Sequence, residues 1–207
     1  MVWLWAFAAW LSGSLMFSYW LGLLVHHRLD NVGDGNPGGV NLLKAAGIGW
    51  GLAGIALDFL KGYVPVFVLI YSGAVSGYEL LPIAVAPVLG HAFSPFMRFR
   101  GGKAIAVTFG VWSALTGFEV SLALAVLLAI LRLIDKASRR SRPSMPESDA
   151  VQVMMGMLLV YVYMSIAGFA AYYLWCWLGN FAVLLYTHRR EIGVYVGRVT
   201  ALWRHNS

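Results

Sequence analysis

A glycine-rich polar segment near the N-terminus has the residues to bind an anion. It runs from Asn31 to Lys44 and reads Asn-Val-Gly-Asp-Gly-Asn-Pro-Gly-Gly-Val-Asn-Leu-Leu-Lys. Glycine lets the backbone come close to a ligand, and successive N–H groups in such a segment can point at one anion. A flexible connector between two helices is the alternative. The side-chain donors Asn36, Asn41 and Lys44 favour the anion site.

A second polar segment runs from His91 to Lys103 and ends in Arg-Gly-Gly-Lys, directly before an apolar stretch that predicts a helix. Two glycines and a lysine at a helix N-terminus bring backbone donors, the positive end of the helix dipole and an ammonium to one place, which suits a phosphate. It is not a Walker loop, because the Ser or Thr after the lysine and the preceding strand are missing. The alternative is a basic, aromatic anchor at the membrane interface.

His188 and Glu191 form a third polar group at the end of the last apolar stretch. We expect His188 to lie at the same depth as Lys44 and Lys103. Three polar segments that are far apart in the sequence would then converge on one face. Their convergence predicts a site for an anionic, phosphate-bearing ligand.

Membrane-spanning helices must position these segments. Hydrophobic residues make up 60% of the 207-residue chain and charged residues only 12%, with a mean hydropathy of +0.72. A soluble domain is about 25% charged. The apolar runs have close to the length of roughly 20 residues that crosses the hydrocarbon core. The break Thr116-Gly-Phe-Glu119 divides the longest run in two, so we predict an all-α fold with seven transmembrane helices, over residues 3–25, 48–71, 80–97, 104–116, 119–133, 151–167 and 168–186.

Basic residues fall on alternate sides of these spans. The loops near residues 72–79, 116–119 and 167–168 have no Lys or Arg, whereas the loops on the other side carry nearly all of them. Because Lys and Arg are held on the cytoplasmic side, the N-terminus is expected outside and the C-terminus in the cytoplasm, across a bacterial inner membrane. The net charge of +6 follows this bias. We therefore expect anionic lipid contacts and no nucleic-acid ligand.

Asp58 and Lys61 form a charged i,i+3 pair inside an expected span. Charges in hydrocarbon must pair or face a polar interior. An ion pair that fixes helix packing is the favoured interpretation. A transporter built around this pair is the alternative, but no internal repeat supports it.

Several motifs in this order resemble the PlsY family of bacterial acyl-phosphate glycerol-3-phosphate acyltransferases. The resemblance runs nearly end to end and rests on Gly13-Ser-Leu followed by Tyr19, Gly33-x-Gly-Asn-Pro-Gly-x-x-Asn41, Asp58-x-x-Lys61-Gly62, Gly90-His91-x-Phe, Phe99-x-Gly-Gly-Lys103 and His188-Arg189. It implies a single membrane-embedded domain over residues 1–207. This domain would transfer a fatty acyl group from acyl phosphate to the 1-hydroxyl of glycerol 3-phosphate, giving lysophosphatidic acid. No metal, other cofactor or covalent acyl-enzyme is implied.

The resemblance also implies roles for individual residues. The two glycine-bearing loops would hold the phosphates, and the residues expected to do so are Gly33, Gly35, Asn36, Asn41, Lys44, Gly101, Gly102 and Lys103. His188 would help to bind or orient the acceptor. The secondary candidates are Ser14, His91, Ser138 and Ser141. The last two stand where the family has a serine-containing stretch. The sequence does not indicate an oligomeric state.

The sequence departs from the family at five motif positions. Asp34 replaces a serine, Lys44 an arginine, Ala104 a glycine, Met16 a proline and Glu191 an asparagine. Two of these changes place a carboxylate where a phosphate is expected, which disfavours anion binding. One hypothesis is therefore that Asp34 or Glu191 acts as a general base for a different, uncharged or cationic acceptor. Another is that the chain keeps lipid contact but has lost catalysis.

Overall fold

All regular secondary structure that the computed structural model describes is helical. The described residues are 1–138 and 145–205, with side chains to residue 201. In chain order the helices are α1 (Val2–Ser14), α2 (Phe17–Leu24), η1 (Leu29–Asn31), α3 (Gly39–Ala46), α4 (Ile48–Tyr71), η2 (Gly77–Glu79), α5 (Leu80–Ala92), η3 (Pro95–Met97), α6 (Ile105–Thr116), α7 (Glu119–Ser138), α8 (Pro146–Ile166) and α9 (Ala171–His205). The described part contains no strand, which confirms the predicted all-α class.

Four helical stretches are long and apolar enough to cross a membrane. They are Val2–Leu24, Ile48–Tyr71, Gly77–Met97 and Pro146–Ile166. Helix α6 is apolar but has only 12 residues, a length of about 18 Å. The predicted break after it is present, because Gly117 and Phe118 both adopt positive φ between α6 and α7. The count of seven spans stays a prediction.

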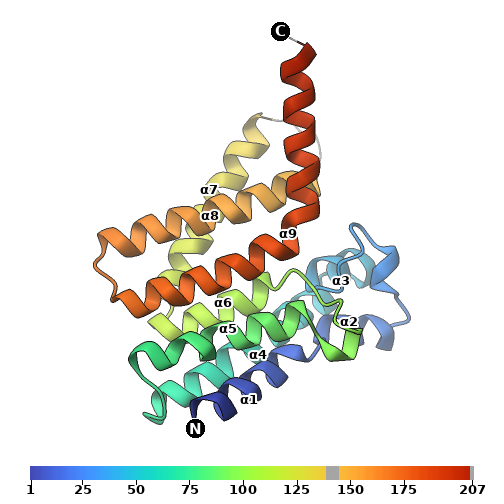
Figure 1. Cartoon of the computed structure of the whole chain (residues 1–207). Coiled ribbons are helices and arrows are strands. Elements are labelled where there is room, and N and C mark those ends of the chain that lie inside the picture. Colours follow the sequence, from blue (N-terminus) through green and yellow to red (C-terminus); the bar gives the residue numbers. More distant parts are fainter. Residues whose placement is uncertain (139–144, 206–207) are drawn as a thin grey trace.

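The helices form a bundle whose members run side by side, with α1 against α5, α4 against α6, and α9 against both α5 and α8 (Figure 1). The loops that connect α4 to α5 and α8 to α9 lie at one end of the bundle, whereas α2 and α3 lie at the other (Figure 1). The loops without Lys or Arg therefore share one end.

Glycines set the closest of these helix contacts. A Cβ added at Gly90 of α5 would lie 2.2 Å from the Trp10 carbonyl oxygen of α1, and one at Gly110 of α6 would lie 2.1 Å from the Phe59 carbonyl oxygen of α4. Neither contact leaves room for a side chain. Small residues at such positions let two backbones approach closely. In lipid, where no hydrophobic effect drives helices together, this close packing is a main source of helix association.

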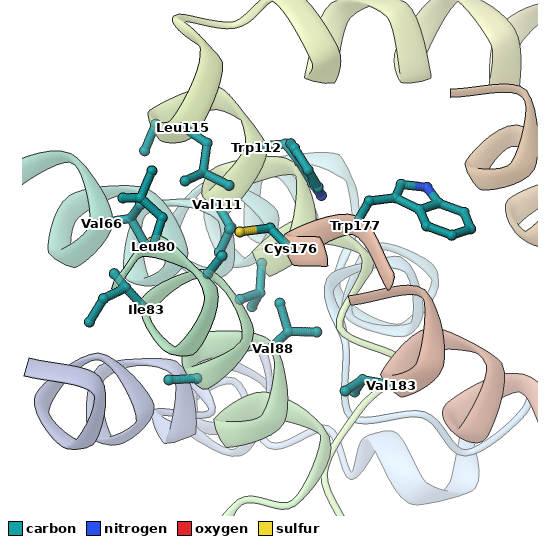
Figure 2. Close-up of a cluster of buried hydrophobic side chains, with 14 of the residues drawn as sticks. Val66, Leu80, Ile83, Val88, Val111, Trp112, Leu115, Cys176, Trp177 and Val183 are labelled. Atoms are coloured by element: carbon teal, nitrogen blue, oxygen red, sulfur yellow. The ribbon is translucent and has the colours of Figure 1, made fainter. Parts of the chain in front are cut away.

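Large apolar side chains fill the space between α4, α5, α6 and α9. Figure 2 shows Val66, Ile83, Trp112 and Cys176 converging from these four helices. Cys176 is fully buried in this cluster. This residue therefore packs in the core, and the cluster joins α4, α5, α6 and α9.

One expectation about local structure needs correction. The polar segment up to Lys44 is shorter than predicted, because α3 begins at Gly39 and contains both Asn41 and Lys44. Gly38 precedes this helix with an extended backbone. The segment therefore presents a helix N-terminus as well as a glycine-rich turn.

Candidate anion-binding site

A cavity of about 520 Å³ opens at the end of the bundle that carries α3. It brings together the three polar segments that the sequence analysis singled out. Its polar lining comes from Asp34, Asn36, Asn41, Lys44, Lys103 and His188, and its apolar lining includes Ile55, Phe59, Phe109 and Val153. The cavity thus joins a charged mouth to an apolar wall between α4, α6 and α8.

The turn before α3 is held together by its own side chains. Asn41 donates from Nδ2 to Asp34 Oδ1 at 2.8 Å and to the Asn36 carbonyl oxygen at 3.0 Å. The Asn36 N–H also donates to Asp34 Oδ1, at 3.1 Å. Gly33 and Gly35 adopt φ of 58° and 72°, values that glycine reaches without steric penalty. These glycines shape the turn that presents Asp34 and Asn36.

Lys103 is the charge at the centre of the site. Its ammonium lies 2.7 Å from Asp34 Oδ2 and 2.9 Å from Glu191 Oε1. Partial burial would raise the pKa of Asp34, but the hydrogen bond and charge of Lys103 lower this pKa below its usual value. Burial likewise acts to lower the pKa of Lys103, yet the two carboxylates raise it. Both shifts favour the charged forms of Asp34 and Lys103 at neutral pH.

Gly101 and Gly102 have a different local role from the one expected. Their N–H groups donate to the Ala92 and His91 carbonyl oxygens at the end of α5, so they do not point freely at a ligand. A Cβ at Gly101 would lie 1.8 Å from the His91 carbonyl oxygen. These glycines allow the loop to pass close to α5. The donors left for a ligand are the first N–H groups of α6, which begins after Ala104 without a side-chain cap.

Three helix N-termini line the cavity. Residues at the starts of α3, α6 and α8 contribute to it, namely Gly39, Ile105 and Pro146. Each N-terminus carries the positive end of a helix dipole, worth roughly half an elementary charge. Among the described residues no carboxylate pairs with Lys44, which also lines the cavity. The mouth therefore keeps positive potential although Lys103 is paired.

His188 is buried and reaches the cavity from α9. Its Nδ1 lies 2.8 Å from the Leu184 carbonyl oxygen. A carbonyl oxygen only accepts, so Nδ1 carries the proton of the neutral ring and Nε2 remains an acceptor. The position at the cavity and the free Nε2 make this histidine a candidate proton acceptor.

Glu191 follows His188 by one turn and lies next to Lys103, beside the residues that line the cavity. Its Oε1 binds Lys103, while its buried Oε2 has no hydrogen-bond partner among the residues that the structure describes. A buried carboxylate oxygen without a partner is costly unless a ligand or water satisfies it. Oε2 is therefore a second place where a hydroxyl could donate.

Beneath the mouth lies a buried polar chain. Lys61 pairs with Asp58 at 2.8 Å, donates to His91 Nδ1 at 2.7 Å and also donates to the Leu15 carbonyl oxygen. Ser18 donates to the other Asp58 oxygen at 2.5 Å. The expected ion pair is thus present, and it ties α1, α2, α4 and α5 together below the loop that carries Lys103.

Two of the secondary serine candidates, Ser14 and Ser138, lie away from the cavity lining. Ser14 is fully buried and donates to the Trp10 carbonyl oxygen of its own helix. Ser138 is exposed and donates to the Ile134 carbonyl oxygen. Ser141 lies outside the described residues. His91 does line the cavity, although its Nδ1 is taken by Lys61.

Sequence reasoning missed the start of α8. Asp149 and Ala150 line the cavity, and Asp149 is held by Arg132 of α7. A signal for this helix start was available, since Pro146 followed by Glu147 and Asp149 is typical of the first turn of a helix. The apolar wall was missed as well, because residues such as Phe59 and Phe109 have the spacing of ordinary lipid-facing or core positions.

The fold and the cavity define a class: a helical membrane protein with an anion-binding mouth that opens onto an apolar wall. The family described as glycerol-3-phosphate acyltransferase matches residues 3–197. Glycerol-3-phosphate acyltransferase 1 of Thermotoga maritima is 36% identical over 190 residues, covering 90% of this chain and 93% of the relative. The corresponding enzyme of Aquifex aeolicus is 29% identical over 187 residues, covering 89% and 90%.

Solved structures agree with the sequence relatives. The crystal structure of PlsY, an integral membrane glycerol 3-phosphate acyltransferase, in its glycerol 3-phosphate form is similar with a TM-score of 0.81 at 27% identity, covering 95% of this chain and 93% of that one. Its lysophosphatidic acid form gives a TM-score of 0.79. This chain belongs to the glycerol-3-phosphate acyltransferase family, which confirms the resemblance seen in the sequence. It is a membrane protein with the fold of an acyltransferase.

The buried ion pair generates a prediction about stability. Changing Lys61→Met leaves Asp58 as an uncompensated buried charge, so we expect a loss of about 3–5 kcal/mol in the free energy of unfolding. Thermal unfolding in detergent micelles measures it. The double change Asp58→Asn with Lys61→Met should recover more than half of the loss, whereas Lys136→Met, at an exposed site, serves as the control. Equal stability of Lys61→Met and the wild type would contradict a structural pair.

Proposed function

We propose that this chain transfers a fatty acyl group from acyl phosphate to the 1-hydroxyl of glycerol 3-phosphate, giving lysophosphatidic acid and inorganic phosphate, with no metal or other cofactor. The observation that carries the proposal is the cavity. It combines an anion-binding mouth with an apolar wall between α4, α6 and α8. A donor with a phosphate at one end of a fatty chain needs both surfaces, and membership of the family supports the same reaction.

The phosphates bind at the positive parts of the mouth. Lys44, Lys103 and the first N–H groups of α3 and α6 supply cationic and backbone donors. Asn36 accepts from the Lys103 N–H through Oδ1 at 3.1 Å, which leaves its Nδ2 as a further donor. Gly33, Gly35, Gly101 and Gly102 act by shaping the two loops around the ligand.

The glycerol part of the acceptor binds at the carboxylates. Glycerol hydroxyls donate hydrogen bonds, and the buried Oε2 of Glu191 is an acceptor without a partner among the described residues. With this orientation the two acidic residues do not oppose the binding of an anionic acceptor. The acids face its hydroxyl end, while Lys44 and the helix N-termini face its phosphate.

His188 takes the proton from the attacking hydroxyl. In this step the hydroxyl oxygen forms a bond to the acyl carbon, the bond from that carbon to the phosphate oxygen breaks, and phosphate leaves. The hydroxyl proton passes to His188 Nε2, which is an unprotonated acceptor because Nδ1 donates to Leu184. Asp34 is a weaker base, since Lys103 lowers the pKa of its carboxyl. Acyl phosphate is already activated, so positioning and electrostatic stabilisation supply the catalysis.

A second candidate function follows from the two ion pairs of Lys103. If the carboxylates keep Lys103 neutralised in the bound state, the mouth favours an uncharged or cationic acceptor over glycerol 3-phosphate. The donor phosphate would still bind at Lys44 and the helix N-termini. Product analysis with different acceptors separates this candidate from the first.

We propose that the cavity faces the cytoplasm of a bacterial inner membrane, with seven spans, the N-terminus outside and the C-terminus inside. Supporting this orientation, the basic residues Lys44, Arg98, Arg100 and Lys103 belong to the end of the bundle with α3. The opposite end carries the loops without Lys or Arg. The positive-inside rule places the first end in the cytoplasm.

Cysteine labelling tests the orientation. Ala74→Cys, in the α4–α5 loop, should react with an impermeant maleimide added to intact cells. The matched change Ala137→Cys, near the end of α7, should react only after the cells are opened. The natural Cys176 is fully buried and gives the background. Labelling of both sites in intact cells, or the reverse pattern, would overturn the proposed topology.

Turnover by the purified protein tests the reaction. With acyl phosphate and glycerol 3-phosphate, we expect release of phosphate and formation of lysophosphatidic acid. Lys103→Ala removes a central cation and should reduce kcat/KM by about 100-fold or more, while the exposed Lys136→Ala serves as a matched control. Full activity of Lys103→Ala would contradict the anion site. Phosphate release with other acceptors alone would favour the second candidate, and its absence with every acceptor would mean that catalysis has been lost.

Asp34 tests how the carboxylates affect the acceptor. Replacing Asp34→Ser removes a negative charge from the phosphate-binding mouth, so we expect the KM for glycerol 3-phosphate to fall by about tenfold with kcat little changed. Tenfold is about 1.4 kcal/mol, between the values of about 1 kcal/mol in water and about 4 kcal/mol at an effective dielectric of 20 for charges about 4 Å apart. Steady-state kinetics measure both constants. Loss of kcat would identify Asp34 as the base instead, and unchanged constants would show that it has no influence on acceptor binding.

A further inference from the structure

Helix α9 continues well beyond the site. It extends from Ala171 to His205, whereas the cavity residue His188 lies near its middle. Figure 1 shows that the later part of α9, drawn in red, turns away from the direction of the first part and runs across the direction of α1, α4 and α5. If the bundle crosses the membrane, this later part runs along the membrane surface.

Residues 191–201 of this helix, here called the surface segment, have one apolar side. Ile192, Tyr195, Val196 and Val199 follow the three-and-four spacing of a single helix face. Tyr195, Val196 and Val199 are 39%, 53% and 38% exposed, and only Ile192 packs partly against the core. Gly193, Gly197 and Thr200 lie outside this face, and so does one exposed apolar residue, Val194. The segment therefore has one continuous apolar side that the rest of the described chain leaves open.

Two ion pairs fix the rotation of the surface segment. Glu191 contacts Lys103 at 2.9 Å, and Arg198, seven residues later, contacts Glu147 of α8 at 3.4 Å. Residues seven apart lie on nearly the same side of a helix. The side with Glu191 and Arg198 faces the bundle, and it is about a quarter turn around the helix from the apolar side. The apolar side is therefore directed laterally, roughly at right angles to the contact with the bundle.

The position and charge of the segment identify what covers this apolar side. It follows the last expected span directly, at the level where α9 leaves the bundle. Arg189 and Arg190, directly before the segment, are exposed, and Glu191, the acidic residue of the segment, is turned to Lys103. A helix with an apolar side and uncompensated basic residues lies in the headgroup region of an anionic membrane.

We propose that the surface segment is an interfacial helix that inserts Val196 and Val199 into the headgroup boundary of the leaflet on the cavity side, with Arg189, seven residues before Val196 and therefore on nearly the same side, contacting anionic headgroups. The contact holds the start of the segment, and with it Glu191, at a fixed height beside the cavity. This surface is distinct from the acyl-binding wall, because none of its residues lines the cavity.

Two neighbouring positions test the insertion in the full-length protein. Val199→Cys places a fluorophore on the apolar side, and Gly197→Cys places the same fluorophore about 200° away around the helix. A Cβ at Gly197 has no atom within 4 Å, so the control position tolerates the change. In nanodiscs, nitroxide groups near the lipid headgroups should quench the Val199 probe several-fold more than the Gly197 probe. Aqueous iodide should show the opposite order.

Lipid charge supplies the second arm. Adding phosphatidylglycerol to phosphatidylcholine nanodiscs should increase lipid quenching of the Val199 probe, and Arg189→Gln should reduce that increase. Equal iodide quenching of both probes in every lipid would overturn the proposal. Shielding of the Val199 probe from iodide and from lipid alike would overturn it too, since a second copy or another protein would then cover the segment. None of these readouts depends on acyl transfer.

Discussion

The ammonium of Lys103 holds the site together. It bridges Asp34 in the turn before α3 and Glu191 in α9, and the backbone N–H of Lys103 donates to Asn36 Oδ1. Three segments separated by most of the chain are thereby joined at one point. The contacts are half-buried, so they are screened less than surface pairs and hold the loops in a defined arrangement before any ligand arrives.

That arrangement depends on a rigid platform beneath it. Gly90 and Gly110 let α5 approach α1 and α6 approach α4 to backbone contact. The pair of Asp58 and Lys61 fixes the rotation of these helices with buried hydrogen bonds. Because Gly101 then packs on the end of α5, the height of Lys103 is set by the platform and not by the loop alone. A shift of one helix would move the ammonium away from both carboxylates.

The sequence predicted those features that depend on pattern. Apolar runs and the break at Gly117 gave the helices, and the positions of Lys44, Lys103 and His188 predicted their convergence. It could not predict the roles that depend on contacts. Gly101 and Gly102 look like phosphate ligands by type and spacing, but their N–H groups are used by α5. The start of α8 was missed because two of its cavity residues, Ala150 and Val153, have no chemistry of their own, and because Asp149 reaches the cavity only through the position of the helix.

The charge balance of the mouth explains how it can hold both carboxylates and phosphates. The charges of Asp34 and Glu191 offset those of Lys103 and Lys44, so these side chains together are close to neutral. The positive potential that remains comes from the N-termini of α3, α6 and α8, which are fixed dipoles and need no rearrangement when a ligand binds. A phosphate can therefore be recognised by the helix starts, while the acids stay available for hydroxyl groups. Position within the mouth, rather than its total charge, then determines which end of an acceptor binds where.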